Sequence, residues 1–106
     1  MRILFDQGTP VPLRHALTAH VVETTYERGW STLENGELLD VAEQEGFEAL
    51  LTTDLRLKYQ QNLEERRIAI VVLTTPSWPR IQRVVKTVVS AVDQLGGGGY
   101  VEVEIP

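Results

Sequence analysis

The sequence Ile68-Ala69-Ile70-Val71-Val72-Leu73 is the most apolar run in the chain. A strand with no polar side chain has no face suited to water, so it is expected to be buried on both sides. Strands of this kind are typical of parallel sheets covered by helices on both faces. The run therefore predicts a central strand of an α/β fold.

Helical and strand-like segments alternate along the rest of the chain. Further strands are expected at residues 2–5, 20–24, 48–53 and 100–105. Helices are expected at residues 10–19 and 35–45, and a last one is expected to start between Pro76 and Pro79 and to end near Leu95. A turn or short helix is expected at residues 25–30, and a loop or one helical turn at residues 55–62. This order predicts one domain, residues 1–106, with a three-layer α/β/α sandwich and a mostly parallel central sheet.

The composition excludes several classes of function. The chain of 106 residues has a net charge of -5 and no cysteine, so disulfides and thiolate chemistry are ruled out. An acidic surface attracts nucleic acid only through a local basic patch or a metal ion. No apolar run has the roughly 20 residues needed to span a bilayer, and the strand-like start has no leader pattern. We expect a soluble, cytoplasmic protein with no membrane partner.

Two aspartates follow predicted strands directly. Asp6 comes after Ile3-Leu4-Phe5, and Asp54 comes after Ala49-Leu50-Leu51-Thr52-Thr53. Ligands bind outside the carboxyl ends of parallel strands, so both carboxylates are expected on one rim. Neighbouring carboxylates repel unless a cation or a proton separates them, and Mg²⁺ or Mn²⁺ takes oxygen ligands. The alternative for each aspartate is a structural role as a cap or in a turn.

A third acid, Glu37, lies in the first turn of a helix that Asn35 is expected to cap. Its charge suits the positive end of that helix, which is a sufficient structural reason for an acid there. Its functional interpretation is a third carboxylate at the same rim, with Asn35 as a neutral oxygen ligand. Acids around a divalent cation can activate water and stabilise the charge on a phosphate.

Basic residues occur in two places that could hold an RNA. Arg56 and Lys58 follow Asp54 closely, and Arg80, Arg83 and Lys86 recur at every third position of the last predicted helix. Both groups could contact a phosphate backbone. The alternatives are an exposed polar loop and a solvated helix face. The broad valine face of that helix is assigned to the core, and a dimer interface is its alternative.

Three short motifs, taken in order, resemble the small stand-alone PIN-like proteins of the PIN nuclease superfamily. The first is Arg2-Ile3-Leu4-Phe5-Asp6-Gln7-Gly8-Thr9-Pro10, the second runs from Asn35 to Gly46, and the third is Leu50-Leu51-Thr52-Thr53-Asp54. The second predicted strand, His20-Val21-Val22, is also similar, and the resemblance covers Met1 to Leu73. A receiver domain is a weaker alternative, because paired acids at the first strand end are missing.

The resemblance implies a PIN-type fold and a ribonuclease, that is, a hydrolase dependent on Mg²⁺ or Mn²⁺. Carried over by position, Asp6, Asp54 and Glu37 would be the catalytic and metal-binding acids. Arg56, Lys58, Arg80 and Arg83 are then the residues expected to position the RNA substrate. The resemblance also implies a possible toxin of a toxin–antitoxin pair, with an antitoxin partner and a homodimer. Gln7 stands where these proteins usually have an acid, so the alternative is a PIN-like module with weakened chemistry that acts through protein–protein binding.

Overall fold

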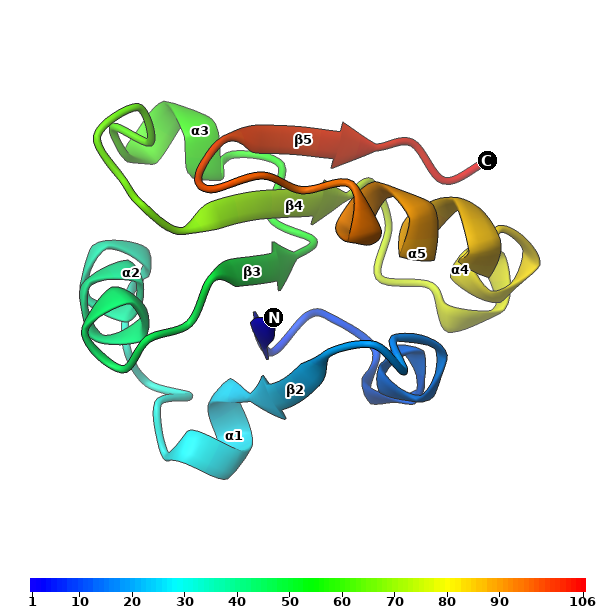
Figure 1. The fold of residues 1–106 in the computed structure, drawn as a ribbon, viewed down its shortest axis with the longest axis horizontal. Helices are drawn as coiled ribbons and strands as arrows, with labels where there is room; N and C mark the ends of the chain where they lie inside the picture. The colour runs from blue at the N-terminus through cyan, green and yellow to red at the C-terminus, as the bar shows by residue number, and fades with distance from the viewer.

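A five-stranded, all-parallel sheet forms the centre of the molecule (Figure 1). The computed structural model describes residues 1–106. The strands are β1 (Arg2–Phe5), β2 (Val21–Thr24), β3 (Ala49–Thr52), β4 (Ala69–Leu73) and β5 (Tyr100–Val103). Their spatial order is β2-β1-β3-β4-β5. The predicted parallel α/β architecture is confirmed, and β5, which lies within the strand predicted at residues 100–105, is at one edge of the sheet.

Helices connect the strands and cover both faces of the sheet. They are η1 (Val11–Ala16), α1 (Thr25–Arg28), α2 (Asn35–Gln44), α3 (Leu57–Gln60), α4 (Trp78–Arg83) and α5 (Val85–Asp93). The 3₁₀ helix η1 packs with α4 and α5 over one face, while α2 and α3 pack over the other. None of these helices has the length and apolar content needed to cross a membrane.

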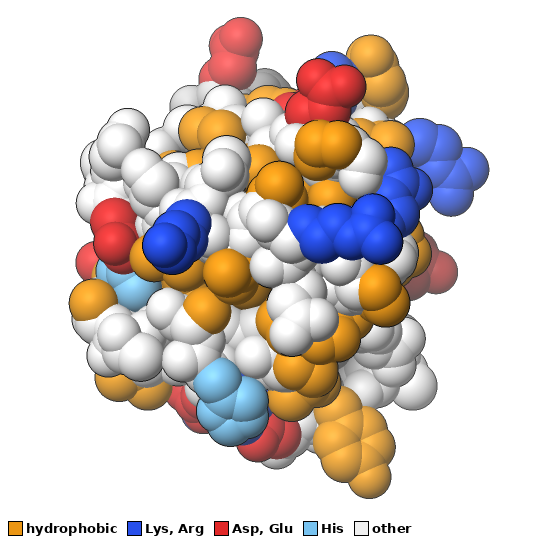
Figure 2. Space-filling view, turned by 90° about the vertical axis from the view of Figure 1, so that its right-hand side faces the viewer, with side chains coloured by type: hydrophobic (Ala, Val, Ile, Leu, Met, Phe, Trp, Pro, Cys, Tyr) orange, Lys and Arg blue, Asp and Glu red, His pale blue; other side chains and the backbone are white.

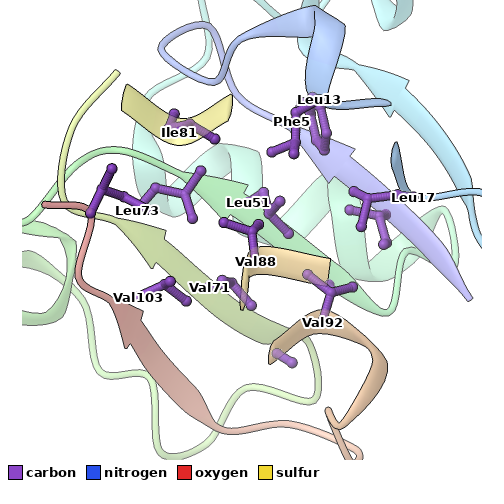
Figure 3. Packing of buried hydrophobic residues seen from close by; sticks show 14 residues of the cluster. Phe5, Leu13, Leu17, Leu51, Val71, Leu73, Ile81, Val88, Val92 and Val103 are labelled. Carbon is purple, nitrogen blue, oxygen red and sulfur yellow. The ribbon is translucent and has the colours of Figure 1, made fainter. Parts of the chain in front are cut away.

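The β4 strand supplies side chains to two separate cores. Ala69, Val71 and Leu73 belong to the core beneath η1, α4 and α5, whereas Ile70 and Val72 belong to the core beneath α2 and α3. All are fully buried, as the apolar run predicts. Figure 3 shows side chains from α4 and α5 pointing at the sheet within the first core. Burial of such a side chain stabilises the fold by about 1.5–3 kcal/mol.

The connection from β4 to β5 has the opposite hand to the connection from β3 to β4. Both connections step one strand in the same direction along the sheet. The earlier connection crosses the face that holds α3, and the later one crosses the opposite face with α4 and α5. As a result, no helix of the β4–β5 connection covers Tyr100 and Glu102. These side chains instead meet Lys58 of α3, whose Nζ lies 2.9 Å from Glu102 Oε1.

Two predicted helices differ from those observed. The first is a 3₁₀ helix that ends at Ala16, not an α-helix reaching residue 19, although it does open at Pro10 as expected. The last predicted helix is broken at Val84, whose φ of -123° and ψ of 28° are not helical, so α4 and α5 are separate. The Val84 amide donates to the Ile81 carbonyl at 3.0 Å, a tighter i→i−3 bond of the kind that ends an α-helix.

Candidate functional site

The sheet order places a topological switch point between β1 and β3. The chain leaves β1 toward β2 on one side and leaves β3 toward β4 on the other. Ligands of open parallel sheets bind in the crevice outside such a point. Asp6 follows β1, and Asp54 follows β3. The Asp6 amide donates to the Leu51 carbonyl of β3 at 3.1 Å. The prediction that both aspartates lie at the carboxyl edge of neighbouring strands is therefore confirmed by the sheet order.

Threonine hydroxyls surround the Asp6 carboxylate. Thr9 Oγ1 lies 2.8 Å from Asp6 Oδ1 and 2.9 Å from the Leu51 carbonyl oxygen, and Thr52 Oγ1 donates to Asp6 Oδ2. Burial raises the pKa of Asp6 above its ordinary value, although the hydrogen bonds from Thr52 and Thr9 act in the opposite direction. A carboxylate in this position gains from a cation because desolvation disfavours its charged form.

Thr52 links the two aspartates through hydrogen bonds. Its hydroxyl donates to Asp6, and the same oxygen accepts the backbone N–H of Asp54 at 3.0 Å. Neither aspartate forms an ion pair with any basic side chain. The rim therefore holds two carboxylates that no protein cation neutralises.

The Asp54 carboxylate joins two segments that are distant in sequence. Its Oδ1 accepts the backbone N–H of Arg56 at 2.9 Å, which is the turn-making role considered as its alternative. Its Oδ2 accepts from Asn35 Nδ2 at 3.2 Å, and the same amide nitrogen also lies 3.0 Å from Gln60 Oε1. The predicted cap was wrong: Glu34 is the N-cap residue of α2, and Asn35 is its first helical residue.

Gly8 allows the loop after β1 to approach the end of β3. A Cβ atom at this position would lie only 2.4 Å from Thr53 Oγ1. A contact under 3.0 Å requires the neighbour to move. Close approach of the two loops is a reason for glycine here, and it keeps Asp6 near the β3 rim.

A small hollow of about 130 Å³ opens beside these residues. Asp6 and Asn35 both line it, together with Trp30 and Leu38. The hollow thus contains a carboxylate and an amide whose Oδ1 is not committed to the bonds with Asp54 and Gln60. Mg²⁺ commonly uses one or two carboxylates with waters and neutral oxygens, so the Asp6 carboxylate and the Asn35 amide oxygen are donors of the kind it takes. Asp54 does not line this hollow.

Glu37 is exposed on α2 and forms no ion pair. No group of three or more acidic or histidine side chains is close enough together to hold a metal ion. The three acids predicted to act together are therefore not gathered around one point. Glu37 lies in the first turn of α2, as the sequence predicts, but its side chain is exposed to solvent there.

The predicted RNA-binding residues have different surroundings. Lys58 is paired with Glu102 and lies over the rings of Tyr59 and Tyr100. Arg80 donates to the carbonyls of Ile105 and Pro106, both at 3.0 Å, and so secures the C-terminal residues.

Arg56, Arg83 and Lys86 are free of acidic partners. The break at Val84 separates Lys86 from the two arginines of α4, so the single basic stripe expected on one helix is wrong. In Figure 2, which faces the end of the molecule where α4 lies, basic side chains stand among uncharged ones and acids lie mainly at the margins. This end is less acidic than the net charge of -5 suggests.

The hydroxyl and amide groups that support both aspartates were not predicted from the sequence. Thr9 lies three residues after Asp6, and Thr52 lies two residues before Asp54. Their closeness in sequence to the strand-end acids is the signal that could have identified them. Gln60 carried no comparable signal, because only the packing of α3 beside α2 brings it to Asn35.

Comparison with protein-family models, with curated proteins and with solved structures found no match. The fold and the rim between β1 and β3 are therefore the features that bear on function.

Proposed function

We propose that this protein is a metal-dependent endoribonuclease of the PIN-like type, with Asp6 and Asp54 holding Mg²⁺ or Mn²⁺. The observation that supports the proposal is the pair of strand-end carboxylates at the switch point, which no basic side chain neutralises. A divalent cation would offset the cost of keeping Asp6 charged in a partly buried position.

The chain's own groups have defined tasks in this proposal. Thr9 and Thr52 orient the Asp6 carboxylate, and Asn35 and the Arg56 amide orient that of Asp54. The metal, when bound, supplies a water of lowered pKa and neutralises charge on the scissile phosphate. Outer contacts to the RNA backbone would come from Arg56 and Arg83, whose charges are not used by acids of this chain.

The test is cleavage of a panel of structured and unstructured RNAs by the purified protein with Mn²⁺. Asp6→Asn and Asp54→Asn each remove one ligand charge while keeping the side-chain shape, so both should reduce the cleavage rate at least a hundredfold. Asp40→Asn is the matched control, because Asp40 is an exposed aspartate on α2 that pairs with Arg66. Cleavage that both rim variants retain would contradict the assignment.

Glu37→Gln belongs in the same series. An unchanged rate would remove Glu37 from the predicted catalytic group, and a large loss would show that it reaches the substrate complex. Arg80→Ala and Lys58→Ala would separately test those two RNA contacts, which compete with the bonds to the C-terminal carbonyls and to Glu102.

The second proposal is a PIN-like module that acts through a partner protein. It is favoured by the absence of a three-acid group at the rim. Calorimetric titration with Mn²⁺ distinguishes the two: saturable binding that Asp6→Asn abolishes supports the nuclease. Absence of binding at millimolar Mn²⁺, with a stable complex to the product of a neighbouring gene, supports the module.

The toxin role, the antitoxin partner and the homodimer remain part of the first proposal. Light scattering on the purified chain, alone and with the neighbouring gene product, would measure both associations. Val88 and Val92 are fully buried in the core, so a dimer would have to use another surface than these valines.

A further inference from the structure

Asn35 and Gly36 form an Asn-Gly dipeptide at the start of α2, beside the rim. An asparagine side chain can lose its amide nitrogen when the backbone nitrogen of the next residue attacks the side-chain carbonyl carbon. Glycine as the next residue favours this attack, because it has no Cβ in the way and its backbone turns most freely. The chain has one other asparagine, Asn62, and the branched Leu63 follows it.

The backbone nitrogen of Gly36 is not held by a hydrogen bond. The first helical bond of α2 runs from the Leu38 amide to the Glu34 carbonyl at 2.7 Å, so the amide of Gly36 has no partner within the helix. The side chain of Glu34, the N-cap residue, accepts no bond from this turn either. A helix start without a side-chain cap is less stable, and helix ends open most readily. The attacking nitrogen is therefore available whenever the first turn opens.

Water reaches this dipeptide from a polar hollow at the start of α2. Its volume is about 430 Å³, and Asn35 and Gly36 line it together with other polar residues and no apolar side chain. A hollow with such a wall holds water, which the second step of the reaction consumes.

Two hydrogen bonds keep the Asn35 side chain in its unreacted position. Its Nδ2 lies 3.2 Å from Asp54 Oδ2 and 3.0 Å from Gln60 Oε1. The helical backbone also turns the Gly36 nitrogen away from the side-chain carbonyl carbon. Both bonds must break and the first turn must open before the ring can close, so the reaction is expected to be slow.

We propose that Asn35 is a site of spontaneous deamidation, which converts the amide at the rim into a carboxylate. The Gly36 nitrogen bonds to Asn35 Cγ, the Cγ–Nδ2 bond breaks, and ammonia leaves with the proton that the Gly36 nitrogen loses. Water then opens the succinimide ring, either at Cγ to give aspartate or at the backbone carbonyl carbon to give isoaspartate. Overall, asparagine and water give an acid and ammonia, and nothing is oxidised or reduced.

The aspartate product would have its carboxylate between Asp6 and Asp54. Asn35 lines the hollow of about 130 Å³ together with Asp6, and its side chain contacts Asp54 Oδ2. An oxygen in place of Nδ2 would face the Asp54 carboxylate, and carboxylates this close repel unless a proton or a cation lies between them. Deamidation would therefore replace a donor that stabilises the rim with an acid that needs a cation. This consequence rests on the metal site proposed above, whereas the deamidation itself does not.

The test is mass spectrometry of the metal-free protein during incubation at mildly alkaline pH and 37 °C. Trypsin places the two asparagines in different peptides, Gly29–Arg56 and Tyr59–Arg66, so Asn62 is a control within the same molecule. We expect Asn35 to be converted at least tenfold faster than Asn62, with both aspartate and isoaspartate formed. Equal conversion at the two asparagines would overturn the proposal.

Three variants test the mechanism. Gly36→Ala should slow the conversion of Asn35 at least fivefold, because a side chain hinders ring closure; the new Cβ would lie 3.3 Å from the flexible end of Gln61. Glu34→Ser adds an N-cap side chain without changing the dipeptide, so it should slow the conversion at least twofold. Gln60→Ala removes one bond to the Asn35 side chain and should accelerate it. Rates unchanged in all three variants would contradict this mechanism.

Asn35→Asp supplies the aspartate product as a uniform sample. In metal-free buffer it should have a lower Tm than the natural protein, and calorimetry should show Mn²⁺ binding at least tenfold tighter. Asn62→Asp is the matched control, since it adds the same charge outside the rim. Equal Mn²⁺ affinity in the two variants would contradict the third rim carboxylate. Deamidation at Asn35 in a protein that binds no Mn²⁺ in either form would contradict the metal site and support the modification alone.

Discussion

Asp6 combines a structural and a proposed chemical role in one side chain. Hydroxyl donors hold its oxygens, yet burial raises its pKa, so the folded protein binds a proton there more readily than the unfolded chain does. A group with a raised pKa stabilises the fold fully only below its unfolded pKa, and that contribution is lost as the pH rises through the folded value. For Asp6 the loss begins above about pH 3.8, its ordinary value.

The first prediction concerns Asp6→Asn. The amide cannot ionise, so the variant should be more stable than the natural protein at pH 7 in metal-free buffer, and this difference should disappear by pH 3.5. Urea unfolding at both values measures it. Mn²⁺ should then stabilise the natural protein selectively, by about 2.7 kcal/mol at a hundred times its Kd. A variant less stable than the natural protein at pH 7 would contradict the argument.

The second prediction concerns the close approach at Gly8. Gly8→Ala should destabilise the protein by about 1–3 kcal/mol, the usual cost of overpacking, because the new Cβ meets Thr53 Oγ1 at 2.4 Å. Thr53→Ala removes that oxygen, so the double variant should recover most of the loss in a double-mutant cycle. Gly96→Ala is the control, since nothing lies within 4 Å of a Cβ there. Equal losses in the single and double variants would rule out this contact as the cause.

At the scale of elements, short helices depend on their caps more than on their own hydrogen bonds. The helix α1 has only the residues Thr25–Arg28, yet its Thr25 and Tyr26 line a hollow of about 670 Å³ beside Asp6. A reciprocal capping box holds its start: the Glu27 amide donates to Thr24 Oγ1 at 3.1 Å, and the Thr24 amide donates to Glu27 Oε1 at 2.9 Å. Gly29 ends it with a φ of 74°.

The third prediction follows from this cap. Thr24→Ala should lower the free energy of unfolding by about 0.5–2 kcal/mol, the range for loss of an N-cap side chain. Chemical denaturation measures the change. Thr32→Ala, at an exposed threonine in a turn, should have an effect within about 0.5 kcal/mol. Amide exchange in α1 should accelerate in Thr24→Ala, and unchanged exchange would show that the cap is not what holds α1.

For the whole molecule, one sheet joins two cores. Leu51 belongs to the core of η1, α4 and α5, while its neighbour Leu50 belongs to the core of α2 and α3. The Leu51 carbonyl also accepts the Asp6 amide, and the Thr9 hydroxyl oxygen lies 2.9 Å from it. The stability of the core and the position of the rim therefore depend on the same strand.

The fourth prediction tests this dependence. Leu51→Ala should destabilise the protein by about 2–5 kcal/mol, because Leu51 is fully buried and its removal leaves a cavity. Leu55→Ala is the matched control, since Leu55 is 43 % exposed and should cost less than about 1 kcal/mol. Thermal unfolding should be a single transition in both, because the two cores share β3. Two resolved transitions would show that the cores unfold separately.

Local patterns were sufficient to predict most elements of the fold. The apolar run at Ile68 to Leu73 became the fully buried β4, and the alternating segment at residues 100–105 contains the edge strand β5. The prolines at the first helix and Gly29 after α1 lie where their backbone preferences suit them. The break at Val84 was not predicted, because periodicity describes which side chains can share a face and not where the backbone bends.

The sequence by itself determined the parallel α/β class and the position of Asp6 and Asp54 at strand ends. Both depend on local patterns, because the apolar residues of a buried strand and the residue that follows it are close together in the sequence. Tertiary structure alone decided that Thr52 links these aspartates, that Glu37 stays in solvent and that Thr25 and Arg14 meet at one hollow. Those outcomes depend on strand order and on helix placement over the sheet. They arise from contacts between distant segments, whose geometry no local spacing of residues specifies.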